Sequence, residues 1–178
     1  MHLEEKTVNS EVIYEGVIFT VTHDTALLEN GSTAFRDVLW HHGGVCVIPV
    51  TENNEIFLVK QFRYPFGTAT REVPAGKLEK GESHEICGRR ELLEETGYTC
   101  SEFIYMGEML PTPAYNSEVT HMYLAKGLTF SSQHLDDDEF LDVEKIPLEE
   151  AVRQVMEGRI RDGKTQLAIL KAARILNL

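Results

Sequence analysis

The sequence contains no stretch that approaches the roughly 18 consecutive apolar residues needed to cross a membrane as a helix. Residues 1–10 also lack a basic start followed by a hydrophobic segment, so we expect neither a membrane span nor a signal peptide. Cysteine is scarce as well, because the chain has only Cys46, Cys87 and Cys100. Few, scattered thiols in an odd number indicate a reducing compartment rather than a disulfide or zinc framework. We therefore expect a cytoplasmic protein.

Basic residues are few relative to acidic ones. Lysine and arginine number 17 against 29 aspartates and glutamates, which gives a net charge of −12. Such a charge argues against binding to nucleic acid or to an anionic membrane. An anionic small molecule would have to be received locally, by arginines and by a metal ion. The seven histidines show no metal-ligand spacing, and the chain has no repeats.

The most informative stretch runs from Gly76 to Tyr98 (GKLEKGESHEICGRRELLEETGY) and concentrates carboxylates behind a glycine-bounded loop. Ser83 is a suitable helix N-cap, and Gly97 is a suitable residue just beyond the helix end. The stretch therefore predicts a loop followed by a helix over 83–96.

Three glutamates of this expected helix, Glu91, Glu94 and Glu95, are spaced at i, i+3 and i+4 and therefore project from one face. Like charges at this spacing destabilise a helix by roughly 0.2–0.5 kcal/mol per pair. Hard cations such as Mg²⁺ would neutralise them. The alternative is an ordinary solvated acidic face, with Arg89 and Arg90 as counter-charges.

The spacing of the fixed residues favours the first interpretation. The stretch fits the pattern G-x5-E-x7-R-E-U-x-E-E-x-G-U, where U is a bulky apolar residue, at Gly76, Glu82, Arg90, Glu91, Leu92, Glu94, Glu95, Gly97 and Tyr98. This pattern is the Nudix box, and the chain resembles the Nudix hydrolases. The resemblance implies an α/β/α sandwich with a mixed sheet, in which the box forms a loop, a helix and a loop.

Alternation of apolar and polar residues predicts a small antiparallel sheet near the N-terminus. Its expected strands are Glu11–Val21, Thr25–Leu28 and Ala34–Trp40. Two or three strands alone bury little apolar surface, so residues 1–42 should form a β extension that packs on the main domain or on a second copy of the chain. The main domain should span residues 43–178.

In the main domain, Val45–Val50 and Ile56–Lys60 are expected to form a buried hairpin, followed by a loop over Gln61–Arg71. After the box, the expected strands are Phe103–Glu108, Val119–Ala125 and Leu141–Ile146. The expected helices are Pro147–Glu157 and Thr165–Leu176. This order of elements fits a layered α/β fold around one core.

A wider resemblance, to the ADP-ribose pyrophosphatase branch of the Nudix family, covers nearly the whole chain. Gln61–Arg63 followed by Glu72–Glu82 (EVPAGKLEKGE) closely resembles the QxR and ExPAGxxExGE pattern of that branch. Residues 113–118 (PAYNSE) resemble its PGFSDE pattern less closely. In this branch a β extension commonly exchanges between subunits, so the resemblance implies a homodimer formed through residues 1–42.

Cleavage of a pyrophosphate requires divalent cations, which neutralise its charge and lower the pKa of the attacking water. We assign Glu91 and Glu95 as the primary Mg²⁺ ligands, with Mn²⁺ as an alternative ion. Glu94 and Glu82 would assist them, and the Ala75 carbonyl is a ligand implied by the resemblance. The structural residues of the box are Gly76, Arg90 and Gly97.

Substrate-binding groups are expected outside the box. Arg63 should hold phosphate through its planar guanidinium, the alternative being a surface ion pair. By resemblance, Arg36 is expected to reach the substrate from the β extension. Glu118 is a candidate for contact with a ribose hydroxyl or a metal-bound water. Aromatic side chains that either stack on adenine or simply pack are Tyr64, Phe66 and Tyr115.

By resemblance, the catalytic base is expected in the acidic loop over residues 135–139, because the box glutamates should be occupied by metal. Glu139 best matches the loop glutamate that the branch commonly supplies, and Asp137 is its expected helper. The alternative is a solvated acidic turn, in which case Glu94 is the next candidate for the base.

Together these assignments predict Mg²⁺-dependent hydrolysis of ADP-ribose, a nucleoside diphosphate sugar, to AMP and ribose 5-phosphate. Other nucleoside diphosphate sugars and dinucleotides stay open as substrates, because specificity resides in loops. Outside enzymes, the alternative is a non-catalytic Nudix-like binding module. Such a module would have no use for three glutamates on one helix face.

Overall fold

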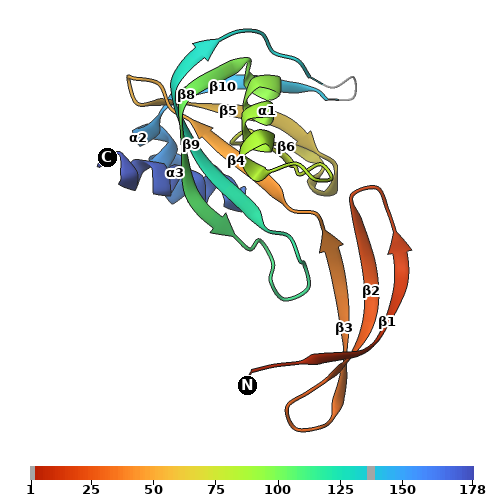
Figure 1. Ribbon diagram of the computed structural model, residues 1–178. Coiled ribbons are helices and arrows are strands. Elements are labelled where there is room, and N and C mark those ends of the chain that lie inside the picture. The colour runs from red at the N-terminus through yellow and green to blue at the C-terminus, as the bar shows by residue number, and fades with distance from the viewer. Residues whose placement is uncertain (1–2, 136–138) are drawn as a thin grey trace. The chain divides into compact units, whose positions relative to one another are not determined.

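The computed structural model describes residues 3–135 and 139–178. The chain divides into two compact units, which are Met1–Gly43 with Leu110–Val119, and Gly44–Met109 with Thr120–Leu178. The smaller unit is built on one three-stranded sheet, and the larger on two sheets with helices (Figure 1). No helix in the described parts of the chain is both long enough and apolar enough to cross a membrane.

The larger unit contains one antiparallel and one mixed sheet. Its strands are β4 (Gly44–Pro49), β5 (Glu55–Arg63), β6 (Thr68–Glu72), β7 (Ala75–Lys77), β8 (Tyr98–Met109), β9 (Thr120–Phe130) and β10 (Leu141–Pro147). The antiparallel sheet has the order β10–β5–β6, and the mixed sheet has the order β7–β4–β9–β8. Within the mixed sheet only the pair β4 and β9 runs parallel among the described residues. The helices are α1 (His84–Thr96), α2 (Leu148–Met156), α3 (Gly163–Ile175) and the short 3-10 helix η1 (Tyr64–Phe66).

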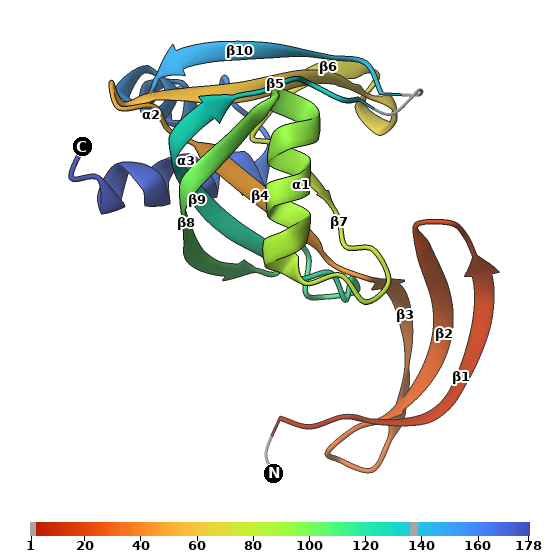
Figure 2. The ribbon, with the colours of Figure 1, turned by 45° about the horizontal axis from the view of Figure 1, so that its top comes forward.

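The central pair β4 and β9 separates two hydrophobic clusters. Val45 and Val47 point from β4 into a cluster with Leu92 of α1. Cys46 and Ile48 point to the opposite face and pack with side chains of α2 and α3. Because successive side chains of a strand alternate between faces, β4 is covered by α1 on one side and by α2 and α3 on the other (Figure 2). This is the α/β/α sandwich with a mixed sheet that the sequence predicts.

Helix α1 begins and ends as expected. The Ser83 hydroxyl accepts a hydrogen bond from the Ile86 N–H at 3.3 Å, which caps the first turn. Gly97 follows the last helical residue in the left-handed conformation, with φ at 76°, and its N–H donates to the Leu93 carbonyl at 2.8 Å. The expected helix over 83–96 is therefore confirmed, and its glutamates are fixed on one short, capped element.

The smaller unit is an antiparallel sheet with its strands in sequence order. The strands are β1 (Lys6–Glu15), β2 (Phe19–Leu27) and β3 (Thr33–His41). Residues 110–119 join this sheet at β3, because the Leu39 N–H donates to the Tyr115 carbonyl at 2.7 Å and the Ser117 N–H donates to the Leu39 carbonyl at 2.9 Å. The exposed large apolar side chains of the sheet include Val8, Val12, Ile13, Tyr14, Phe35 and Trp40.

Two expected elements near the start of the chain are wrong. The strand expected over Glu11–Val21 is interrupted by a tight turn, in which the Gly16 N–H donates to the Phe19 carbonyl at 3.0 Å. The hairpin expected from Val45–Val50 and Ile56–Lys60 is also wrong, because β4 and β5 belong to different sheets, and among the described residues only an isolated bridge between Val50 and Ile56 joins the two segments. Strand β4 instead pairs with β7 and β9, and β5 pairs with β6 and β10.

The loop expected over Gln61–Arg71 is wrong as well, since most of it is a hairpin. Strand β5 continues to Arg63, and the chain returns as β6 after η1. Gly67 makes this return possible, because it adopts a left-handed conformation with φ at 61°. After the box, the expected strands and helices are all present, although β8 and β9 are longer than expected.

Candidate active site

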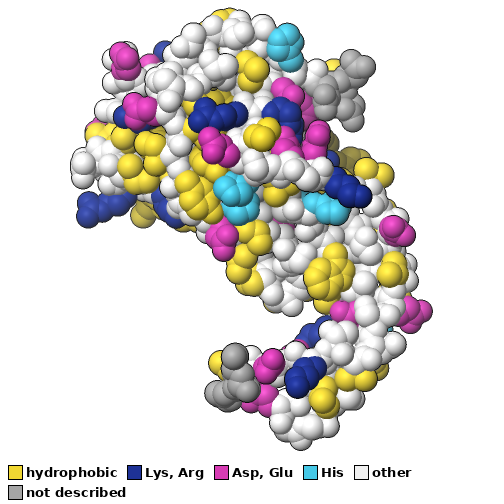
Figure 3. Space-filling view, in the orientation of Figure 1, with side chains coloured by type: hydrophobic (Ala, Val, Ile, Leu, Met, Phe, Trp, Pro, Cys, Tyr) yellow, Lys and Arg dark blue, Asp and Glu magenta, His cyan; other side chains and the backbone are white. Residues whose placement is uncertain are grey.

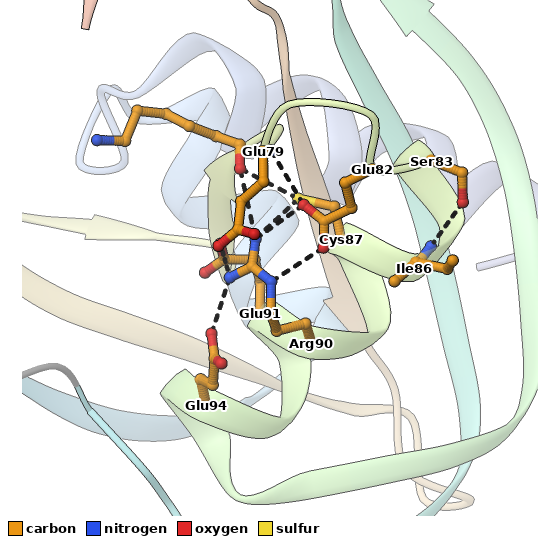
Figure 4. Close-up of polar contacts among 9 residues, drawn as sticks. Glu79, Glu82, Ser83, Ile86, Cys87, Arg90, Glu91 and Glu94 are labelled. Atoms are coloured by element: carbon orange, nitrogen blue, oxygen red, sulfur yellow. Dashed lines mark hydrogen bonds and ion pairs between the residues drawn. The ribbon is translucent and has the colours of Figure 1, made fainter. Parts of the chain in front are cut away.

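Arg90 lies at the centre of a group of glutamates on and beside α1 (Figure 4). Its Nε and Nη2 donate to the two carboxylate oxygens of Glu82 at 3.0 and 3.1 Å. Its Nη1 donates to Glu91 at 2.7 Å and to Glu94 at 2.9 Å. The hydrogen bond between them raises the pKa of Arg90 and lowers the pKa of Glu82. One guanidinium thus forms ion pairs with three carboxylates. Acidic and basic side chains gather on the face that carries α1 (Figure 3).

Glu91 is buried in direct contact with the loop strand that precedes α1. A Cβ atom at Gly76 would lie 1.7 Å from Glu91 Oε1, so glycine leaves the space that this carboxylate occupies. Burial raises the pKa of Glu91, and the charges of Glu94 and Glu139 add to this effect against the opposing influence of Arg90. The positive charge of Arg90 therefore does not fully offset the effect of burial and of the neighbouring carboxylates on Glu91.

Glu95 lies one turn further along α1 and is only 2% exposed. The Ala75 N–H donates to its Oε2 at 3.0 Å. Burial raises the pKa of Glu95 to about 8, and the charges of Glu91 and Glu139 add to this effect, while the Ala75 hydrogen bond opposes it. The strand β7 and the helix are thus joined at the buried end of the acidic face.

The donor set suits a hard divalent cation. Two buried carboxylates with raised pKa values supply oxygen ligands, and a cation beside them would relieve their mutual repulsion. In the described parts of the chain, no group of three or more His, Cys, Asp or Glu side chains is already arranged to hold a metal ion. The fit of Glu91 and Glu95 to Mg²⁺ therefore rests on donor type, burial and charge.

Glu139 lines a cavity of about 370 Å³ beside β5 and β10. Most of the other lining side chains are apolar, and these are Phe62, Ala69, Leu135, Phe140 and Leu141. The charge of Glu139 contributes to the raised pKa values of both Glu91 and Glu95, so the three carboxylates act on one another. Asp137, the expected helper of Glu139, lies outside the described residues.

Arg63 forms a second charged cluster, in which two cations contact one glutamate. Its Nε and Nη2 donate to the two carboxylate oxygens of Glu72 at 2.7 and 2.6 Å. Lys164 Nζ and the Thr70 hydroxyl also donate to Glu72. Burial acts to raise the pKa of Glu72, but Arg63 and Lys164 outweigh it and lower the pKa to about 2. The Glu72 side chain is only 3% exposed, whereas that of Arg63 is 38% exposed, so the pair joins a buried carboxylate to a partly exposed guanidinium.

The NUDIX domain family matches residues 40–166, which span both the acidic helix and the Arg63 cluster. The chain belongs to the Nudix family. The resemblance found in the sequence is confirmed, and so is the enzyme class, a Nudix pyrophosphohydrolase.

Two curated relatives are similar to this Nudix chain over almost its whole length. An ADP-ribose pyrophosphatase of Bacillus subtilis (strain 168) is 39% identical over 94% of this chain and 91% of its own length. A methanol dehydrogenase activator of Bacillus methanolicus is 40% identical over 93% of this chain and 91% of its own length. The crystal structure of an ADP compounds hydrolase has a TM-score of 0.85 at 19% identity, covering 98% of this chain and 95% of that one, so it shares the fold.

The Nudix box brings most of the residues assigned from the sequence together. Glu82, Glu91 and Glu94 meet at Arg90, while Glu95 bonds to the backbone of Ala75. The positive charge of Arg63 partly offsets the rise in the pKa of Glu95, so Arg63 lies within electrostatic range of that carboxylate. The roles of these residues in metal binding and catalysis stay predictions.

Two assigned residues belong to the smaller unit. Arg36 donates to Glu5 at 3.0 and 2.7 Å through Nε and Nη2, and its Nη1 donates to the Phe35 carbonyl at 2.8 Å. The Glu118 N–H donates to the side chain of Asn116 at 2.9 Å. Contact of Arg36 and Glu118 with substrate stays a prediction. The aromatic candidates for adenine stacking are all exposed, namely Tyr64, Phe66 and Tyr115.

Sequence reasoning did not assign a role to Glu72 or Lys164. Glu72 opens the EVPAG segment that carries the family resemblance, so its position next to the box is a signal that the sequence contains. Lys164 is 92 residues away from Glu72 in the chain, and no local pattern connects them. Only the packing of α3 against β4 and β9 brings this lysine to the site.

Proposed function

We propose that this Nudix enzyme hydrolyses the pyrophosphate bond of ADP-ribose to give AMP and ribose 5-phosphate, with Mg²⁺ as its cofactor. The observation that carries the proposal is the pair of buried glutamates, Glu91 and Glu95, together with the positive charge of Arg63, which acts on Glu95. Such an arrangement combines a cation site with a group that binds phosphate. The similarity to an ADP-ribose pyrophosphatase over nearly the whole chain supports the choice of substrate.

Glu91 and Glu95 would be the principal ligands of Mg²⁺. Glu94 and Glu82 would assist them, and the Ala75 carbonyl would add a backbone oxygen. Bound Mg²⁺ would neutralise the pyrophosphate and lower the pKa of the attacking water, and Mn²⁺ is the alternative ion. The raised pKa values of the two buried glutamates support this assignment, because a bound cation favours their charged forms.

Glu139 is our candidate for the general base, which would accept a proton from the attacking water at its carboxylate. Its electrostatic effect on both Glu91 and Glu95 supports this role, and so does its exposure to a cavity. Asp137 would assist it from the same loop. Glu94 is the next candidate, because its carboxylate accepts from Arg90 and is 36% exposed.

Arg63 would bind a substrate phosphate. Its guanidinium has five N–H groups, and the contact with Glu72 uses only two of them. Arg36 would contact the substrate as well, and Glu118 would contact a ribose hydroxyl or a metal-bound water. Rival substrates are other nucleoside diphosphate sugars and dinucleotides, since loop residues decide among them.

The smaller unit would make the protein a homodimer through residues 1–42, with the Nudix domain proper in residues 43–178. Its exposed apolar side chains support this assembly, because a sheet of few strands gains stability by packing on a partner. Three free cysteines fit a reducing compartment, which supports a location in the cytoplasm. A mass in solution equal to one chain at micromolar concentration, with full activity, would reject the dimer.

The proposed activity is tested by incubating the protein with Mg²⁺ and a panel of substrates. The panel contains ADP-ribose, other nucleoside diphosphate sugars, NADH and diadenosine polyphosphates, and the products are separated by chromatography. We expect AMP and ribose 5-phosphate from ADP-ribose, at a higher kcat/KM than for any other compound. Activity should disappear with a chelator and return with added Mg²⁺. If another compound has a higher kcat/KM, that compound rather than ADP-ribose is the substrate. If no compound is cleaved, the protein is a binding module rather than an enzyme.

A further inference from the structure

A buried network connects the start of α3 to the end of β6. Lys164 Nζ contacts both Glu72 and, at 3.0 Å, Asp162. Asp162 caps α3, because its Oδ2 accepts from the Thr165 N–H at 2.9 Å and from the Thr165 hydroxyl at 2.6 Å. The Thr165 hydroxyl oxygen accepts from the Val73 N–H at 2.9 Å. The N-terminus of α3 is therefore fixed to the two residues at which β6 ends and the segment to the Nudix box begins.

Glu72 has its full set of hydrogen bonds within the chain. An ionised carboxylate offers about four lone-pair positions. Oε1 accepts from Arg63 Nε at 2.7 Å and from the Thr70 hydroxyl at 2.5 Å, while Oε2 accepts from Arg63 Nη2 at 2.6 Å and from Lys164 Nζ. Glu72 therefore has no capacity left for a metal ion or a substrate hydroxyl, and its role is to hold the arginine.

The charges of this network balance only when Lys164 is counted. Arg63 and Lys164 are positive, and Glu72 and Asp162 are negative. Burial acts to lower the pKa of Lys164, but Asp162 and Glu72 outweigh it and raise the pKa, so the ammonium stays charged. Without the charge of Lys164, the two carboxylates of Glu72 and Asp162 would be balanced by the Arg63 guanidinium alone. A phosphate arriving at Arg63 would then meet a net negative cluster.

We propose that Lys164 is a positioning residue for Arg63, which by sharing Glu72 and balancing Asp162 keeps the guanidinium fixed and available to a phosphate. This inference rests on the proposed function, in which Arg63 binds a phosphate of the substrate. The Nη1 group takes no part in the contact with Glu72, so it is the end of the arginine that a phosphate can reach. Lys164 itself does not touch the substrate and acts through Glu72.

The test uses Lys164→Met, Lys164→Gln and Lys164→Arg in the full chain. Loss of the charge in Lys164→Met or Lys164→Gln should raise KM for ADP-ribose about tenfold, the effect of losing one charge-assisted hydrogen bond. The value of kcat should change little, and Lys164→Arg should restore KM. The matched control is Lys145→Met, which removes a lysine that pairs with Glu55 at 3.0 Å on the surface of β10 and should leave KM unchanged.

A double-substitution cycle decides whether Lys164 acts through Arg63. In an Arg63→Ala background, Lys164→Gln should raise KM no further, because the group that it positions is gone. An increase in KM of the same size in both backgrounds would overturn the inference. An unchanged KM in folded Lys164→Gln would do the same. Failure of both Lys164→Met and Lys164→Gln to fold would make the lysine a stability residue only, which also overturns it.

A second readout separates this inference from the proposed function. The affinity for ADP, measured by calorimetry with Mg²⁺ present, should fall about tenfold in Lys164→Gln whatever the true substrate is. No turnover of ADP-ribose by the wild type, together with this loss of ADP affinity, would reject the proposed substrate and keep the inference. Turnover of ADP-ribose with KM and ADP affinity independent of Lys164 would reject the inference alone.

Discussion

Glu72 and Glu95 are equally buried, each with 2% of its surface exposed, yet their pKa values lie on opposite sides of the ordinary value for glutamate. The pKa of Glu72 is about 2 and that of Glu95 is about 8. Burial acts in the same direction on both carboxylates. The difference therefore comes from their neighbours.

The Arg63 cluster surrounds one glutamate with two cations, whereas the Arg90 cluster places one cation among several glutamates. In the first cluster the negative charges are balanced by cations of the chain itself. In the second cluster the negative charges outnumber the positive ones, so a bound metal ion would be needed to balance them. Burial alone does not distinguish the two carboxylates, but the sum of nearby charges does.

The largest effect is expected from Glu95→Gln in the second cluster. Turnover should fall by roughly 10³-fold, since a metal ion contributes several kcal/mol to transition-state stabilisation. The free energy of unfolding without metal should stay equal at neutral pH and rise at higher pH, where Glu95 would otherwise carry a buried, repelling charge. The control is Glu85→Gln, which removes an exposed glutamate of the same helix and should keep activity. Near-normal turnover of Glu95→Gln at saturating Mg²⁺ would reject the ligand assignment.

The complementary change in the first cluster is Glu72→Gln. It should lower the free energy of unfolding by about 3 kcal/mol, because Arg63 and Lys164 lose a buried counter-charge. Chemical denaturation measures this loss. The surface change Glu55→Gln, which breaks the pair with Lys145, should cost about 0.5 kcal/mol or less. A Glu72→Gln variant as stable as the wild type would contradict the contrast between the two clusters.

Glu139→Gln tests the residue proposed as the general base. We expect kcat to fall by at least about 10²-fold, the lower end of what a positioned base contributes, with substrate affinity changed much less. Steady-state kinetics with ADP-ribose measures both values. A nearly wild-type Glu139→Gln with an inactive Asp137→Asn would move the base two residues along the loop. Activity in both variants would point to Glu94.

The fourth test is the pH dependence of stability, which should have opposite signs in the two clusters. The pKa of Glu72 falls from 4.5 to about 2 on folding, so its contribution to stability is present above pH 4.5 and is lost as pH falls toward 2. The pKa of Glu95 rises from 4.5 to about 8, so metal-free stability falls as pH rises through that window. Denaturation with a chelator present should show both slopes. Glu72→Gln should flatten only the acid side, and Glu95→Gln only the neutral side.

The sequence predicts the acidic cluster well because its members are local. Helical periodicity alone places Glu91, Glu94 and Glu95 on one face, and the capping residues fix where the helix begins and ends. The same reasoning gives the strands and helices that follow the box. Features that depend on contacts within about one or two helical turns can therefore be predicted from the order of the residues alone.

The Arg63 cluster cannot be predicted in this way. A family pattern assigns Arg63 itself, but its segment was expected to be a loop, and it lies on a strand that pairs across a hairpin. Its link to Lys164 depends on how α3 packs against the mixed sheet. The expected hairpin over 45–60 failed for a related reason, because apolar runs do not reveal which of two sheets each strand joins.

The attachment of residues 110–119 to β3 restricts how this protein can be shortened. The chain enters the smaller unit twice, once at its start and once between β8 and β9. Deleting the first 43 residues would not excise the unit, because the inserted segment would lose the backbone partner that it has at Leu39. Glu118 lies in that same segment. A minimal Nudix domain would therefore need a redesigned connection from Met109 to Thr120, and the sheet and the inserted segment can be gained or lost only together.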